Sequence, residues 1–139
     1  MIIISKFELG PVFKTLVKPN YSYQHTHLTD YIVDLVLENS NASTLLEIGS
    51  FQGGSTLLFA RHLKDRSLNS ALLSIDPHLA GIVPAPNFVP VMPWGQPGNY
   101  FQLLVNILDH GHEDVIVPVQ GLSSSIGRNS MILVQLIMT

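Results

Sequence analysis

Apolar residues follow helical spacing in three parts of the chain. Between Thr29 and Asn39 the apolar positions recur as on one side of a helix, which predicts an amphipathic helix. These positions are Tyr31, Ile32, Leu35 and Val36. A second helix is predicted from Ser55 through Lys64, with Ser55 as its cap, and a third over Tyr100–His110 with Gly111 as its stop.

Three short runs are mostly apolar and do not alternate strictly between apolar and polar residues. They are Thr44–Ile48, Ala71–Ile75 and Val115–Val119. Runs of this kind are typical of strands buried on both faces of a parallel sheet. Because the strands alternate with helices, the pattern predicts an α/β fold, a parallel sheet with flanking helices and right-handed crossovers.

Two segments fit this scheme less well. Residues 79–98 contain five prolines and three glycines and are expected to form one long loop. Met131–Thr139 carries no charge and is apolar on both faces. We expect it to pack against this sheet or against a second copy of the chain, so that the isolated chain self-associates.

Composition narrows the function classes. The 139 residues are 46% hydrophobic and 12% charged, which favours a single folded domain over residues 1–139. A net charge of −3 with seven basic residues gives no reason to expect nucleic acid binding, and no stretch approaches the roughly 20 apolar residues that span a bilayer. The lack of cysteine excludes a thiol nucleophile and a cysteine-ligated metal. Without a signal-like opening, a cytoplasmic location is expected.

The predicted ends of the three strands carry the candidate chemistry. Glu47-Ile48-Gly49 is followed by Gly53-Gly54 at the start of a helix, Asp76 ends the second strand, and Gly121 follows the third. Glycines let a ligand approach the backbone, and a helix amino end presents free N–H groups. Asp76, 22 residues beyond Gly54, is placed to accept hydrogen bonds from ribose hydroxyls. Because parallel strands end at one edge, we expect a single nucleoside site there.

Two side chains argue against a dinucleotide. Phe51 stands where a Gly-x-Gly-x-x-Gly turn needs glycine, and Glu47 would repel a pyrophosphate. A carboxylate suits a ligand with a cationic portion, and S-adenosylmethionine offers an ammonium and a sulfonium.

Three motifs carry a resemblance to a known family. Leu46-Glu47-Ile48-Gly49-Ser50-Phe51-Gln52-Gly53-Gly54-Ser55-Thr56 resembles the first motif of class I S-adenosylmethionine-dependent methyltransferases, in the variant of bacterial O-methyltransferases and cephalosporin-hydroxylase-like proteins. Leu73–His78 and Val117–Ser124 are similar to the second and third motifs of that subgroup. The resemblance covers about residues 27–125 and implies a Rossmann-like fold, of which this chain would be the N-terminal half. The cofactor contacts that it implies are Glu47, Gly49, Ser50, Phe51, Gly53, Gly54, Ser55, Asp76, Pro77, Gly121 and Ser123.

The family's later acidic motif has no counterpart here, because Leu133–Ile137 stands in its place without an acid. The resemblance implies methyl transfer to a small-molecule acceptor, most simply at oxygen, by a chain that looks truncated. His78 is the one candidate general base, and no metal is expected, since the pairs His25/His27 and His110/His112 lie at helix ends or in loops. A catalytically inactive nucleoside-binding domain and an NAD(P)-dependent oxidoreductase domain remain the alternatives.

Overall fold

Helices and strands alternate through the described part of the chain. The computed structural model describes residues 28–38, 44–67, 69–78 and 98–125. In chain order the elements are α3 (Asp30–Glu38), β1 (Thr44–Ile48), α4 (Gly54–Asp65), β2 (Ala71–Asp76), α5 (Asn99–His110) and β3 (Ile116–Gln120). The predicted loop, apart from Gly98, and the predicted tail at Met131–Thr139 lie outside the described residues.

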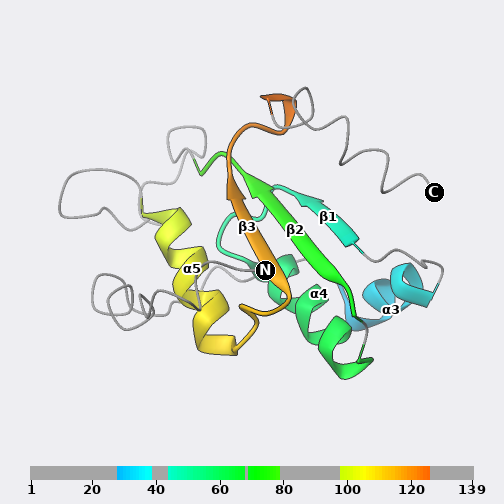
Figure 1. Cartoon of the computed structure of the whole chain (residues 1–139). Coiled ribbons are helices and arrows are strands. Elements are labelled where there is room, and N and C mark those ends of the chain that lie inside the picture. Colours follow the sequence, from blue (N-terminus) through cyan, green and yellow to red (C-terminus); the bar gives the residue numbers. More distant parts are fainter. Residues whose placement is uncertain (1–27, 39–43, 68, 79–97, 126–139) are drawn as a thin grey trace.

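The three strands form one parallel sheet in the order β1-β2-β3. Leu46 of β1 lies opposite Leu73 of β2, which in turn lies opposite Val117 of β3. This confirms the predicted parallel arrangement, with strand bounds that differ by one residue for β2 and β3. All three strands end at the same edge of the sheet, as Figure 1 shows.

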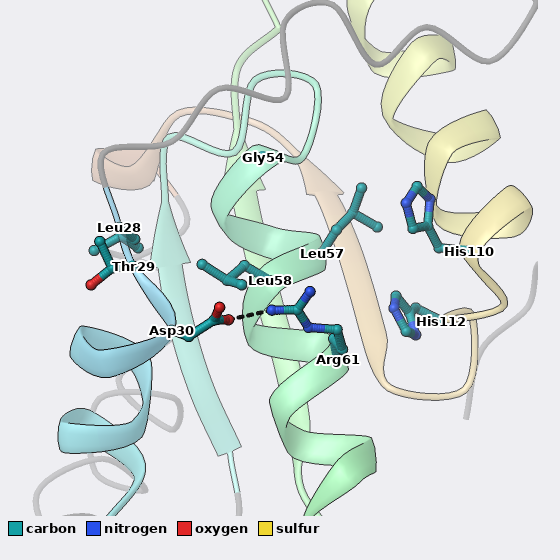
Figure 2. A pocket seen from close by; sticks show the side chains of 9 residues that line it. All are labelled: Leu28, Thr29, Asp30, Gly54, Leu57, Leu58, Arg61, His110 and His112. Carbon is teal, nitrogen blue, oxygen red and sulfur yellow. Dashed lines mark hydrogen bonds and ion pairs between the residues drawn. The ribbon is translucent and has the colours of Figure 1, made fainter.

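The described helices cover one face of the sheet. Two successive right-handed crossovers in the same direction place α4 and α5 on the same side. The buried core joins Leu57 and Leu63 of α4, Leu103 and Ile107 of α5, and Leu72 and Ile116 of the strands. In Figure 2, α4 lies in front of the strands, between α3 and α5. The largest buried apolar cluster therefore lies between these helices and one face of the sheet.

The buried face of α3 differs from the prediction. Val33 and Leu37 are buried, whereas the four residues of the predicted apolar side are exposed. These four are Tyr31, Ile32, Leu35 and Val36. The predicted helix is confirmed as Asp30–Glu38, but these four apolar side chains lie outside its buried face.

Two aspartates share the inward stripe of α3 with Val33 and Leu37. Asp34 lies 2.8 Å from Nδ1 of His62 and accepts a hydrogen bond of 2.6 Å from Arg66, while Asp30 pairs with Arg61 and with His62 of α4. A hydrogen bond from Arg66 holds the pKa of Asp34 below its ordinary value, against a smaller opposing effect of desolvation. The contact between α3 and α4 is thus both apolar and ionic.

Candidate functional site

Backbone hydrogen bonds join the three strand ends. The amide of Gly49, just after β1, donates to the carbonyl of Ile75 at 2.8 Å, and the amide of Gly121, just after β3, donates to the carbonyl of Asp76 at 3.0 Å. The segments that the sequence predicted to share an edge therefore do so, with Asp76 in the middle.

The Asp76 carboxylate ties two loops together. Its Oδ2 accepts a hydrogen bond of 2.9 Å from the amide of Phe51, and its Oδ1 accepts one of 2.6 Å from the amide of His78. The side chain retains 14% exposure. Because each carboxylate oxygen can accept two hydrogen bonds, Asp76 keeps capacity for two further donors, such as a pair of ribose hydroxyls.

The glycine loop is open at one end and tightly packed at the other. Gly49 has a φ of 91°, and a Cβ built there would meet nothing within 4 Å. Gly53 has a φ of 97°, and its Cβ would lie only 2.8 Å from Cδ1 of Leu103 on α5. Phe51 between them also has a positive φ, of 46°. The loop thus leaves room for a ligand beside Gly49 while Gly53 fixes it to the core.

Glu47 is held by hydroxyl groups. Its Oε2 accepts hydrogen bonds from Thr56 at 2.5 Å and from Ser74 at 3.0 Å, and its Oε1 accepts one from Ser55. Three of the roughly four acceptor positions of the carboxylate are thereby used. Glu47 links β1, β2 and the start of α4, and one position remains for a ligand.

The predicted cap of α4 is wrong. Gly53, without a side-chain hydrogen bond, occupies the N-cap position, and Ser55 lies inside the first turn. Its hydroxyl donates to Glu47 instead. The cap therefore lies two residues earlier than predicted, at Gly53, whose φ of 97° favours glycine.

Three buried polar atoms beside this edge have no hydrogen-bond partner within the part of the chain that the structure describes. They are Ser50 Oγ, His78 Nε2 and Asn99 Oδ1. A buried polar atom without a partner costs about 1–3 kcal/mol, so such atoms commonly mark a ligand or water position. Sequence reasoning found Ser50 and His78 but missed Asn99, together with Thr56 and Ser74, because their roles depend on contacts between distant elements.

His78 is buried beside Asp76, Asn99 and Tyr100. Burial lowers the pKa of its imidazole, and the charge of Asp76 offsets this only in part. Its Nδ1 lies 3.3 Å from Nδ2 of Asn99, and its ring lies beside that of Tyr100 with centroids 5.0 Å apart. With Asn99 as donor, the ring proton sits on Nε2. In this tautomer Nε2 carries an N–H donor that has no partner among the described residues, and the general-base role of His78 stays a prediction.

The remaining predicted contacts lie around the same edge. Gly54 opens α4, Pro77 follows Asp76 and is half-buried, and Gly121 is half-buried after β3. Ser123 is exposed and begins a short helical turn. The structure therefore gathers all of the predicted residues near one edge, and their contacts with a ligand stay predictions.

These residues fit the S-adenosylmethionine cofactor that the sequence implies. The open space beside Gly49, the unpartnered Ser50 hydroxyl and the spare acceptor positions of Asp76 would suit a nucleoside with hydroxyl groups. Glu47 is half-buried, and its carboxylate, with one acceptor position left, would suit a cationic group nearby.

A cavity of about 490 Å³ lies elsewhere, on the outer side of α4 (Figure 2). It is lined by Leu28, Thr29, Asp30, Gly54, Leu57, Leu58, Arg61, His110 and His112. The rings of His110 and His112 stack with centroids 6.0 Å apart, and no cluster of three metal-ligating side chains occurs within the described ranges. The cavity shares only Gly54 with the strand-end site, so we do not assign the nucleoside to it.

Comparison with known proteins supports the fold. No family model and no curated protein sequence matches the chain. One matching crystal structure is that of "a putative O-methyltransferase from Klebsiella pneumoniae", with a TM-score of 0.53 and 17% sequence identity. The match covers 93% of this chain and 51% of the Klebsiella chain, so the present chain spans about half the length of that protein. The predicted α/β fold with a Rossmann-like parallel sheet is thereby confirmed.

Among the described helices, none has the length and apolarity that crossing a bilayer would require.

Proposed function

We propose that the chain binds S-adenosylmethionine at the carboxyl edge of its sheet and serves methyl transfer to a hydroxyl group of a small molecule. The observation that carries the proposal is the position of Asp76, whose carboxylate fixes the glycine loop and retains two acceptor positions at the edge. The fold similarity to the Klebsiella protein agrees with this function at a coarse level.

The chain's own residues bind and orient. Asp76 accepts hydrogen bonds from the ribose, the loop from Gly49 to Gly53 passes beneath the ligand, and Glu47 keeps the start of α4 against the sheet. The bound cofactor supplies an electrophilic methyl group on its sulfonium. Since the transfer is an in-line displacement, the protein accelerates it mainly by positioning the two reactants and excluding water. The site residues named here need not include a catalytic acid or base.

Binding tests the cofactor assignment directly. We expect calorimetry to show that S-adenosylhomocysteine binds the full chain more tightly than NAD does. Asp76→Ala should weaken binding by about 1.5–3 kcal/mol for each charge-assisted hydrogen bond lost, which is tenfold or more. The control is Asp114→Asn, because Asp114 pairs with Lys64 near the opposite end of β3 and should not affect affinity. Tighter binding of NAD would overturn the proposal.

A nucleoside-binding domain without turnover is the second candidate. The described contacts concern the nucleoside alone, because Asp76 and the glycine loop lie at the strand ends where it would bind. Incubation with methyl-labelled cofactor and a panel of small phenols and alcohols separates the two. Binding with label transfer supports the methyltransferase, whereas binding without transfer to any acceptor supports the nucleoside-binding domain.

A further inference from the structure

The inner side of α5 carries two amide side chains among apolar ones. Gln102 and Asn106, four residues apart, are 2% and 0% exposed, and their neighbours Leu103 and Ile107 belong to the apolar core. Taking an amide group out of water costs free energy unless new hydrogen bonds replace those to water. Apolar side chains at these two positions would carry no such cost, so the role of the amides lies in the hydrogen bonds that they make.

These hydrogen bonds lead from α5 to the glycine loop. Nε2 of Gln102 donates to Oδ1 of Asn106 at 3.0 Å, and Nδ2 of Asn106 donates to the backbone carbonyl of Gln52 at 3.0 Å. A backbone carbonyl only accepts hydrogen bonds, so the amide of Asn106 must turn its NH2 group toward Gln52 and its oxygen toward Gln102. Gln102 therefore orients the amide of Asn106, which contacts the loop.

The peptide unit between Gln52 and Gly53 is hydrogen-bonded at both of its polar groups. Its carbonyl accepts the hydrogen bond from Asn106, and its N–H group, which belongs to Gly53, donates to the carbonyl of Ser50 at 2.8 Å. The first bond joins the loop to a residue 54 positions away in the chain, while the second closes the turn within the loop. The orientation of this peptide unit thus depends on α5 as well as on the loop itself.

The residue before this peptide unit is held by another element. The amide of Phe51 donates to Oδ2 of Asp76 at 2.9 Å, and Phe51 has a φ of 46°. A positive φ is uncommon for a residue other than glycine and persists only where the surrounding structure fixes it. Asp76 on β2 and Asn106 on α5 therefore hold two consecutive residues of the loop, Phe51 and Gln52.

Asn106 has no exposed surface, so it acts through the loop rather than on a ligand directly. A loop that is already ordered binds a ligand more tightly, because no further ordering cost arises on binding. We propose that Asn106, oriented by Gln102, is a positioning residue that holds the glycine loop in the arrangement that binds the nucleoside. This inference rests on the proposed function for the identity of the ligand.

Amide hydrogen exchange in the full chain tests the hold on the loop without any ligand. Asn106→Leu keeps the approximate size of the side chain and removes its amide group. We expect the amides of Phe51 and Gly53 to exchange at least tenfold faster in this variant, relative to the amide of Leu72. Leu72 lies near the other end of β2, and its amide donates to the carbonyl of Val115. A purely structural role of Asn106 would speed exchange at the three amides alike.

Calorimetry with S-adenosylhomocysteine as the probe tests the consequence for binding. We expect Asn106→Leu to weaken the affinity at least tenfold. Gln102→Met, which removes only the orienting amide, should change exchange and affinity in the same direction by smaller factors, and it replaces Asn106→Leu if that variant does not fold. The control is Ile107→Val, which loosens the core beside Asn106 and leaves the amide contacts in place. Its relative exchange rates and its affinity should stay within twofold of the wild-type values.

Equal acceleration at all three amides, or unchanged exchange in both amide variants, overturns the hold on the loop. Selectively faster exchange in the loop with unchanged affinity overturns the positioning role. The same losses in Ile107→Val would assign the effect to packing and also overturn the proposal. Failure of the wild-type chain to bind S-adenosylhomocysteine contradicts the proposed function instead, and the exchange rates then still decide whether Asn106 holds the loop.

Discussion

Two glycines in the same loop differ in the space around them, so alanine substitutions can measure how tightly the candidate site is packed. Gly49 and Gly53 both have φ values near +95°, at 91° and 97°. A Cβ at Gly49 would meet nothing within 4 Å, whereas one at Gly53 would lie 2.8 Å from Cδ1 of Leu103. Alanine at either position therefore imposes the same backbone strain, and only alanine at Gly53 adds a steric clash.

The magnitudes follow from these two effects. A non-glycine residue at a positive φ costs about 1–3 kcal/mol. Leu103 is fully buried, so the end of its side chain cannot move aside freely, and overpacking of this kind costs a further 1–3 kcal/mol or so. We expect Gly49→Ala to lower the free energy of unfolding by about 1–3 kcal/mol, and Gly53→Ala to lower it by about 2–6 kcal/mol.

Urea unfolding followed by far-ultraviolet circular dichroism measures both values. The steric part is isolated by a double-mutant cycle of Gly53→Ala with Leu103→Val, since the smaller valine makes room for the new methyl group. The double variant should be more stable than the sum of the single effects predicts, by about 0.5–3 kcal/mol. The same cycle with Gly49→Ala should show no coupling.

Equal losses for the two alanine variants would refute this reasoning. Such a result would mean that the loop near Gly53 is not held against α5 as described. Additive effects of Gly53→Ala and Leu103→Val would lead to the same conclusion, because they would show that the two side chains do not meet.

Two other substitutions test the polar contacts. Glu47→Gln weakens three hydrogen bonds from hydroxyls and should lower the free energy of unfolding by about 1–3 kcal/mol in urea titrations. The control Glu38→Gln, at an exposed position, should change this free energy by less than about 0.5 kcal/mol. Similar losses in the two variants would contradict the role of Glu47. The pKa values of Asp30 and Asp34 are lowered below 3.8 by hydrogen bonds from His62 and Arg66, so the stability that these carboxylates contribute is present above that pH and is lost as the pH falls below it. The urea midpoint should therefore fall between pH 5 and pH 3, and fall less in Asp34→Asn; an unchanged slope in that variant would contradict the ionic contact.

The strands and their parallel order could be predicted because they depend on local patterns. Apolar runs of five residues that alternate with helical segments are compatible with few folds other than a parallel sheet. The predicted strand Thr44–Ile48 matches β1 without change. The stop at Gly111 was also correct, since its φ of 65° needs glycine and the signal is contained in one residue.

The face of α3 could not be predicted in the same way. Apolar spacing favours Tyr31 and Leu35 on the inside, but the partners that decide the matter are charged residues of α4, about 30 positions later in the chain. Asp30 and Asp34 face His62 and Arg66, whereas Tyr31 is exposed. Pattern analysis treats aspartate as an exterior residue and has no means of pairing it with a distant cation.

The site shows the same division between local and distant information. Its residues could be found by motif, because glycines and acids follow the strands at fixed intervals. The contacts of Asp76 could not be found, since its carboxylate accepts hydrogen bonds from Phe51, 25 positions earlier, as well as from nearby His78. Asp76 therefore holds the loop and is also the proposed ligand acceptor, and a single substitution of Asp76 would change both.

Asp76→Ala would remove ligand acceptors and also leave two backbone amides without partners, so a loss of affinity could reflect a displaced loop. Gly53→Ala separates the two, because it disturbs the loop and leaves the Asp76 carboxylate intact. If Asp76 contacts the ribose directly, Asp76→Ala must weaken S-adenosylhomocysteine binding by more than Gly53→Ala does, even where Gly53→Ala is the less stable protein.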